Sequence, residues 1–325
     1  MQFRIATAAA HPNIAFVKYW GNRDDRLRLP SNSSLSMNLA GLQTQTTVEF
    51  IEGWEEDELV IGGEKRTGLA KERVSIYLGH IRALAGLNLR ARVTSRSNFP
   101  AGAGLASSAS AFAALTLAGA AAAGLTLSEK ELSALARLGS GSAARSIPSG
   151  FVEWQAGGTA EDSFAFTIAP PGHWGLVDVI AAISHKHKAV GSTGGHALAR
   201  TSPLQAARVA AAPDRLRRCR EALLTRNFPA LSEVTEADSN LMHAVMLTST
   251  PPLYYWEPLT LAIMQAVRAW RAEGLPVCFT VDAGPNVHCL CLAEAAPEVE
   301  RRLRENLGVR EILTATPGGP ARLVD

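Results

Sequence analysis

The segment Pro100-Ala-Gly-Ala-Gly-Leu-Ala-Ser-Ser-Ala109 stands at the start of a long Ala-rich stretch. Gly102 and Gly104 permit a tight turn because they carry no Cβ. A helix that begins here has first-turn amides without intrahelical partners, and its dipole adds roughly half a positive charge. Ser107 and Ser108 add hydroxyls that can reach phosphate oxygens or Mg²⁺. The segment predicts a phosphate-binding turn; the alternative is a Gly-rich turn that only caps a core helix, since no lysine completes the GxxxxGK[ST] pattern.

The Ala-rich stretch from Leu105 to Leu127 predicts a buried helix. It contains three serines and two glycines. Alanine is only weakly apolar, whereas a membrane span needs about 20 strongly apolar residues. We therefore expect no membrane segment here.

Strand and helix patterns mix along the rest of the chain without strict βαβ alternation. Alternating apolar positions predict strands at Phe3–Thr7, Thr44–Ile51, Asn88–Ser95, Ser163–Ile168, Val177–Ile183, Val277–Val281 and Val287–Leu292. Helical spacing, caps and the Pro-first, Gly-last asymmetry predict helices from Ser128, at Leu204–Leu224, at Phe228–Met246, between Pro258 and Gly274, and between Pro297 and Gly308. The mixture favours an α+β fold.

Length and composition narrow the protein class. The chain has 325 residues and a mass of 34.5 kDa, and a single core stops growing at about 250–300 residues, so two lobes are expected, 1–175 and 176–325. The 47% hydrophobic content excludes an intrinsically disordered chain, and the net charge of +2 argues against a dedicated nucleic-acid binder. The four cysteines form no CxxC pair and no secretory apolar stretch opens the sequence, so a reducing cytoplasm is expected.

Three further segments each place one charged residue in an apolar or small-residue setting. Lys18 lies in HPNIAFVKYWGNRD, Arg145 ends GSGSAAR, and Asp282 closes the apolar run FTVD. A buried lysine needs a partner, a guanidinium binds carboxylate or phosphate bidentately, and a carboxylate at a strand end suits a general base. The alternatives are a lysine that extends to water, a solvated loop and a turn aspartate.

Taken together, the segments resemble a known enzyme family. The loop 100–109 resembles the PxxxGLxSSA motif of the GHMP kinase superfamily, which includes galactokinase, homoserine kinase, mevalonate kinase and phosphomevalonate kinase. The order along the chain resembles the mevalonate diphosphate decarboxylase family within it. The matching segments are NIAFVKYWGNRD, LPSNSSLS, NFPAGAGLASSA, RLGSGSAARS, DSNLMHA and DAGPN.

This resemblance implies a two-lobed α+β fold. Lobe 1–175 would resemble ribosomal protein S5 domain 2 and bind ATP, and the ferredoxin-like lobe 176–325 would complete the substrate site. The resemblance also implies a homodimer. Family enzymes use ATP and Mg²⁺ to phosphorylate the tertiary 3-hydroxyl of a 5-phosphorylated mevalonate; loss of that phosphate and of CO₂ leaves an isopentenyl product.

The resemblance assigns roles to particular residues. Asp282 would accept the hydroxyl proton, Arg145 would hold the substrate carboxylate, and Lys18 would bridge the reacting groups. Substrate contacts would fall on Tyr19, Asn22, Arg73, Ser140, Gly141, Ser142, Ser192 and Thr193. Contacts to the ATP phosphates would fall on Asn98, Gly102, Gly104, Leu105, Ala106, Ser107 and Ser108, with Ser107 or Ser108 contacting Mg²⁺.

Two departures from the family pattern bear on the substrate. Asn22 stands where the family has a lysine that contacts the 5-phosphate end, and His196 stands where Met is common. Loss of a charge-assisted contact costs ~1.5–3 kcal/mol, and a diphosphate should lose more than a monophosphate. The cluster 185–188, HKHK, is either a phosphate-facing patch or a solvated loop.

The departures favour conversion of mevalonate 5-phosphate to isopentenyl phosphate. One alternative is decarboxylation of the diphosphate to isopentenyl diphosphate. A second is a small-molecule kinase that releases no CO₂. A third is a ligand-binding regulator descended from such an enzyme. The presence of Asp282, Lys18 and the loop serines argues against it, because a regulator would have lost one or more of them.

Overall fold

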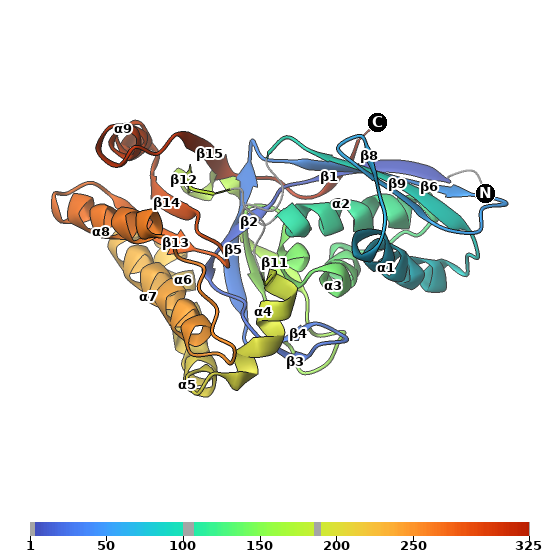
Figure 1. The fold of residues 1–325 in the computed structure, drawn as a ribbon, viewed down its shortest axis with the longest axis horizontal. Helices are drawn as coiled ribbons and strands as arrows, with labels where there is room; N and C mark the ends of the chain where they lie inside the picture. The colour runs from blue at the N-terminus through green and yellow to red at the C-terminus, as the bar shows by residue number, and fades with distance from the viewer. Residues whose placement is uncertain (1–3, 100–106, 185–189, 325) are drawn as a thin grey trace.

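The computed structural model describes residues 4–99, 107–184 and 190–324, which form two lobes (Figure 1). The sheet of the first lobe has the order β16-β1-β6-β9-β7-β8, in which only β7 and β9 are parallel neighbours. Its strands are β1 Ile5–Ala10, β6 Thr44–Ile51, β7 Glu58–Ile61, β8 Glu64–Arg66, β9 Arg90–Ser97 and β16 Arg322–Val324.

Helices α1 Leu69–Ala85 and α2 Ser107–Ala122 pack on one face of this sheet, and α3 Glu129–Gly139 packs against these two helices (Figure 1). Alternate residues of β6 are buried, as its period-2 pattern predicts. Helix α2 packs between β1 and β6 on one side and α1 and α3 on the other, so it is buried on most of its surface. Its small side chains permit this close packing: a Cβ at Gly119 would come within 2.6 Å of Ile81 Cδ1.

The second sheet has the order β11-β10-β5-β15-β12-β14-β13, and β2 also pairs with β5. Its strands are β2 Asn13–Val17, β5 Ser34–Ala40, β10 Phe151–Trp154, β11 Ala165–Ala169, β12 Leu176–Ala182, β13 Val277–Val281, β14 Val287–Leu292 and β15 Glu311–Pro317. A short hairpin, β3 Asn22–Asp24 and β4 Leu29–Pro30, stands apart from both sheets.

Helices pack on both faces of the β12–β14–β13 part of this sheet. Leu176 and Ile180 of β12 contact the core under α6 Ala212–Leu224 and α7 Phe228–Leu247. Val177, Val179 and Ala181 contact the core under α8 Pro258–Ala272 and α9 Ala296–Leu307. Burial on both faces explains why these strands are almost continuously apolar.

Hydrophobic clusters join the two lobes. The larger one joins Ile14, Phe16 and Met37 from the first half of the chain to Leu216 and Leu231 from the second. A smaller one packs Trp20 against residues of α7. In addition, β15 pairs with β5 and β16 returns to pair with β1. These contacts connect the two halves, although each half also has a hydrophobic cluster of its own. The division into 1–175 and 176–325 stays a prediction.

The predicted α+β class is confirmed, and β6, β13 and β14 have the predicted bounds. The capping box at Ser128 and Glu131 also forms. The single helix predicted at 204–224 is wrong: α5 Gln205–Ala210 ends before α6 begins, because Pro213 in the first turn of α6 lacks an N–H for the preceding turn. In the described ranges, no helix has the length and apolar character that crossing a membrane requires.

Candidate active site

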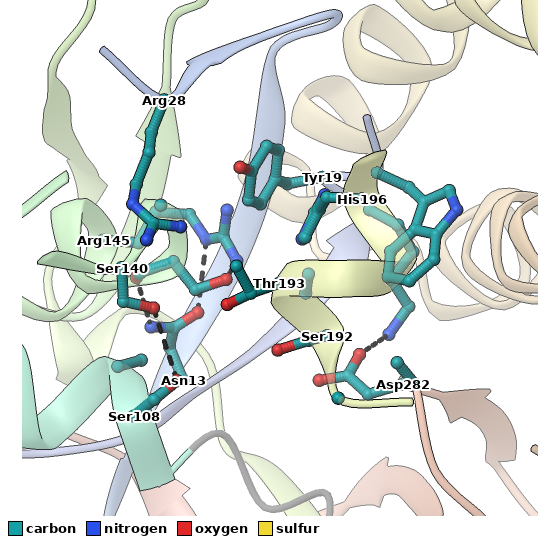
Figure 2. A pocket seen from close by; sticks show the side chains of 18 of the residues that line it. Asn13, Tyr19, Arg28, Ser108, Ser140, Arg145, Ser192, Thr193, His196 and Asp282 are labelled. Atoms are coloured by element: carbon teal, nitrogen blue, oxygen red, sulfur yellow. Dashed lines mark hydrogen bonds and ion pairs between the residues drawn. The ribbon is translucent and has the colours of Figure 1, made fainter. Parts of the chain in front are cut away.

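A cleft of about 410 Å³ collects residues from both lobes (Figure 2). All three predicted catalytic residues line it: Lys18, Arg145 and Asp282. The predicted substrate-binding and phosphate-binding residues that line it are Tyr19, Arg73, Ser107, Ser108, Ser140, Gly141, Ser142, Ser192 and Thr193. The structure therefore brings together side chains that lie up to 264 positions apart in the sequence.

Lys18 and Asp282 form an ion pair at one end of the cleft. Lys18 follows β2 and Asp282 follows β13, and their Nζ and Oδ1 atoms are 2.6 Å apart. The lysine side chain is only 2% exposed, so it needs this partner, whereas Asp282 is 27% exposed and open to the cleft. Burial tends to raise the pKa of Asp282, but the charges of Lys18, His288 and Arg145 together lower it below the usual value. Asp282 is therefore ionised at neutral pH.

Helix α7 fixes the backbone beside both members of this ion pair. Asp238 Oδ2 accepts a hydrogen bond of 2.6 Å from the Lys18 backbone N–H, and its Oδ1 accepts one of 2.6 Å from Arg215 Nε. One residue further, Ser239 Oγ accepts a hydrogen bond of 3.0 Å from the Val281 N–H. The sequence assigned no chemical role to the DSNLMHA motif, residues 238–244; in the structure its Asp238 and Ser239 align two strand ends.

Arg145 is held by hydroxyl and amide oxygens. It lies on the short helix Gly141–Ser146, donates from Nη1 to Ser34 Oγ at 2.6 Å, and donates from Nε to Ser36 Oγ at 3.0 Å and Asn13 Oδ1 at 3.2 Å. Burial lowers the pKa of Arg145 to about 10, which still leaves it cationic at neutral pH. Across the described ranges it has no carboxylate partner within ion-pair distance, so its charge remains available to an anion in the cleft.

The first turn of α2 lies beside the 140–142 segment. Ser108 Oγ and Ser140 Oγ are 3.3 Å apart. Gly141 packs directly against the ring of Tyr19, where a Cβ would collide with the ring atoms. The predicted phosphate-binding helix end and the predicted substrate segment therefore meet in one place.

Helix α4, Ser192–Leu198, closes the cleft on the side of Asp282 (Figure 2). Its His196 stacks on Tyr19 with ring centroids 4.1 Å apart, and Nδ1 accepts a hydrogen bond of 3.0 Å from the Gly21 N–H. Burial, followed by the charges of Arg28, Arg208 and Arg145, lowers the pKa of His196 to about 3. The ring is therefore neutral and carries its proton on Nε2.

Several predicted residues lie elsewhere. Asn22, in β3, does not line the cleft: its Oδ1 accepts a hydrogen bond from the Tyr19 hydroxyl and its Nδ2 donates to Asp25 Oδ1 at 2.9 Å. Asn98 also does not line it, and instead bonds the backbone of Gly41 and Gln43. Outside the described residues lie Gly102, Gly104, Leu105 and Ala106, together with the 185–188 cluster.

Arg28, which no sequence motif singled out, lines the cleft from the turn between β3 and β4. The turn sequence DDRLR is polar and irregular, so no periodicity marked one of its arginines as directed inward. Asn13 was also missed. Its Nδ2 donates to Ser146 Oγ at 2.8 Å while its Oδ1 orients Arg145.

Comparisons with known proteins identify the family of this chain. A model of the diphosphomevalonate decarboxylase-like N-terminal domain matches residues 10–165, and a model of the mevalonate 5-diphosphate decarboxylase C-terminal domain matches residues 178–318. The chain belongs to the diphosphomevalonate decarboxylase family. The predicted family, the GHMP-kinase-like fold and the class of ATP-dependent decarboxylase are thereby confirmed.

Individual relatives cover almost the whole chain. The diphosphomevalonate decarboxylase of Candida albicans is 40% identical over 86% of this chain and 82% of its own length. The phosphomevalonate decarboxylase of Haloferax volcanii is 37% identical over 98% of both chains. The structure of the mevalonate diphosphate decarboxylase from Enterococcus faecalis is 37% identical over 99% of both chains, with a TM-score of 0.93. A structure described as MDDEF in complex with MVAPP, AMPPCP and magnesium is 38% identical over 99% of both chains, with a TM-score of 0.94.

Proposed function

We propose that this member of the family catalyses the ATP-dependent decarboxylation of mevalonate 5-phosphate to isopentenyl phosphate. The activity on a 5-phosphorylated mevalonate rests on the family and on the Lys18–Asp282 ion pair in a cleft that also holds Arg145. The preference for the monophosphate rests on Asn22. This residue is neutral, does not line the cleft, and has its side-chain amide hydrogen-bonded to Tyr19 and Asp25.

The first turn of α2 fits the phosphates of ATP. The helix dipole places positive charge at this end, and Ser107 and Ser108 both line the cleft. Hydroxyl oxygens are also acceptable ligands for Mg²⁺, which prefers oxygen donors. ATP with Mg²⁺ would supply the phosphoryl group that converts the 3-hydroxyl into a leaving group. A structural relative described with AMPPCP and magnesium supports the same expectation.

The charged residues of the cleft have three different roles in the reaction. Asp282 accepts the proton of the 3-hydroxyl, through the carboxylate oxygen that Lys18 does not occupy. Lys18 keeps that carboxylate ionised and places a positive charge beside the reacting oxygen. Arg145 holds the substrate carboxylate in line. When the C3–O bond breaks and phosphate leaves, the electrons of the C1–C2 bond form the new double bond and CO₂ departs.

The experiment that tests the proposal compares kcat/KM for mevalonate 5-phosphate and mevalonate 5-diphosphate, with CO₂ release as the readout. We expect the monophosphate to be preferred by at least about tenfold, which corresponds to ~1.4 kcal/mol. Preference for the diphosphate would reverse the assignment of substrate and leave the decarboxylase class intact. ADP release without CO₂ would instead indicate the kinase alternative.

The assembly is the second part of the proposal. The resemblance implies a homodimer, so the mass in solution should be roughly 69 kDa, twice the 34.5 kDa of one chain. Multi-angle light scattering measures this mass directly.

A further inference from the structure

Arg28 directs a positive charge into the cleft. Figure 2 shows its guanidinium on the side of Arg145 and Tyr19, away from the Lys18–Asp282 ion pair. The side chain is half-buried and comes from the turn that joins β3 to β4. It therefore enters the cleft from a different element than the predicted substrate-binding residues.

The backbone and the inner end of this side chain are held firmly. Arg28 has φ of 48°, a conformation that non-glycine residues adopt uncommonly. Its Nε donates a hydrogen bond of 2.9 Å to the Leu138 carbonyl near the end of α3. Neither terminal nitrogen has a hydrogen bond or an ion pair with any residue in the described ranges. The anchored Nε thus leaves the outer N–H groups free for a ligand.

The surroundings of Arg28 are rich in positive charge. Arg73 and Arg145 line the same cleft, and across the described part of the chain neither forms an ion pair with a carboxylate. Burial, and then the charge of Arg28, lowers the pKa of Arg73 to about 10. Three guanidinium groups without acidic partners favour a ligand that carries more than one negative charge.

Asn22 is poorly placed to serve that ligand. Both ends of its amide are bonded within the hairpin region, to the Tyr19 hydroxyl and to Asp25. In the same hairpin, Arg28 is the cationic residue that lines the cleft. In a 5-phosphorylated mevalonate, the carboxylate and the phosphate lie on either side of C3. With the 3-hydroxyl at Asp282, the carboxylate and the phosphate can therefore reach neighbouring cations.

We propose that Arg28 binds the 5-phosphate of the substrate and so gives the site its specificity for phosphorylated over unphosphorylated mevalonate. This inference rests on the proposed function. A planar guanidinium pairs with phosphate oxygens through two parallel N–H···O bonds, which a neutral amide cannot match in strength. The hairpin therefore offers one cation to the 5-phosphate, Arg28, and only a neutral amide at Asn22.

The test compares Arg28→Met with Arg26→Met. Both arginines belong to the same turn, but Arg26 is exposed and does not line the cleft. We expect Arg28→Met to raise the KM for mevalonate 5-phosphate, and its Kd measured by calorimetry without ATP, by about tenfold to a hundredfold. The KM for ATP should change little, and Arg26→Met should behave as the wild type.

Unphosphorylated mevalonate separates phosphate binding from general damage to the cleft. As a competitive inhibitor it should bind Arg28→Met as well as it binds the wild type, because it lacks the group that Arg28 contacts. An equal loss of affinity for mevalonate, or no loss for the phosphorylated substrate, overturns the proposal. If Arg28→Met does not fold, Arg28→Lys serves as the test instead. Its single ammonium group should give a smaller but measurable loss of affinity for the phosphorylated substrate and no loss for mevalonate.

Failure of this inference and failure of the proposed function are distinguishable. Wild-type preference for the diphosphate would overturn the proposed substrate, whereas the role of Arg28 would still be decided by its variant on the substrate that reacts. Conversely, an unchanged Arg28→Met would overturn the role of Arg28 and leave the measured substrate preference as it stands.

Discussion

Asp282 owes its chemistry to the charge that lies next to it. Burial alone would raise its pKa and weaken it as an anion at neutral pH, but Lys18 lies 2.6 Å away and reverses the direction. The dependence is mutual, because a lysine that is 2% exposed requires a counter-ion. Removing one member of such a pair leaves an uncompensated buried charge, which typically costs ~3–5 kcal/mol.

Replacement of Asp282 by asparagine should abolish most turnover while substrate binding persists. The amide keeps the size of the side chain but cannot accept the hydroxyl proton, and loss of a general base typically lowers kcat by about 10²–10⁴-fold. CO₂ release measures the loss, and calorimetry with the phosphorylated substrate measures the binding. Turnover near the wild-type rate would show that the role assignment is wrong.

The pH profile of the wild-type protein checks the same residue. Because the pKa of Asp282 lies below its usual value, its carboxylate is still ionised in mild acid and loses its charge only as the pH falls through the lowered pKa. With saturating substrate, the acid limb of kcat that belongs to Asp282 should therefore lie below about pH 4. The wild-type acid limb can be assigned to Asp282 if it is absent from Asp282→Asn. If a limb assigned in this way lies near neutral pH, the pKa of Asp282 is not lowered.

The sequence predicted the positions of some site residues and not of others. Lys18, Arg145 and Asp282 each stand in a distinctive motif, and all three line the cleft. Arg28 could not be predicted, because its position depends on a left-handed backbone conformation and on the path of a hairpin. Asn22 was predicted to contact the substrate, but it does not line the cleft, and its hydrogen bonds to Tyr19 and Asp25 could not be foreseen.

At the scale of elements, α7 organises the site without lining much of it. Asp238 on its buried face accepts the Lys18 N–H and pairs with Arg215, while Arg208 donates to the Lys18 carbonyl at 2.8 Å. The same helix bonds Val281, the residue before Asp282, through Ser239. One rigid helix thus sets the spacing of two strand ends that belong to different halves of the chain.

Asp238→Asn should destabilise the protein and lower kcat together. The substitution leaves the buried Arg215 and Arg208 without a counter-charge, so the free energy of unfolding should fall by ~3–5 kcal/mol. Urea denaturation measures this change. Glu233→Gln is the matched control on the same helix, because its ion pair with Arg218 is exposed and should matter little. A stability equal to that of the control would argue against a structural role for the Asp238 network.

The elements that the sequence predicted share a strong local signal. Strands β13 and β14 are short apolar runs with a turn between them, and α3, α8 and α9 carry capping or Pro and Gly signals at their ends. Helix α1 was missed because its apolar pattern is broken: Leu69, Ile76 and Leu84 are exposed. The pairing of β15 with β5 joins positions about 280 residues apart, and no local pattern encodes such a contact.

At the scale of the whole molecule, the lobes are joined by more than the cleft. Strand β15 hydrogen-bonds to β5, and β16 adds an edge strand to the first sheet. The largest shared cluster packs Phe16 and Met37 against Leu216, Leu231 and Leu290. Each half also forms a hydrophobic cluster of its own, so the shared cluster is what couples the two halves.

The protein should consequently unfold in one cooperative transition, although its length would permit two. If the shared core couples the lobes, differential scanning calorimetry should give a single peak whose calorimetric and van't Hoff enthalpies agree. Saturating mevalonate 5-phosphate should move that peak as a whole to higher temperature, because a ligand bound between the lobes stabilises only the state in which both are folded. Two resolved peaks, with the ligand shifting only one of them, would mean that the lobes are energetically separate. The ion pair of Lys18 and Asp282 would then break when the less stable lobe unfolds.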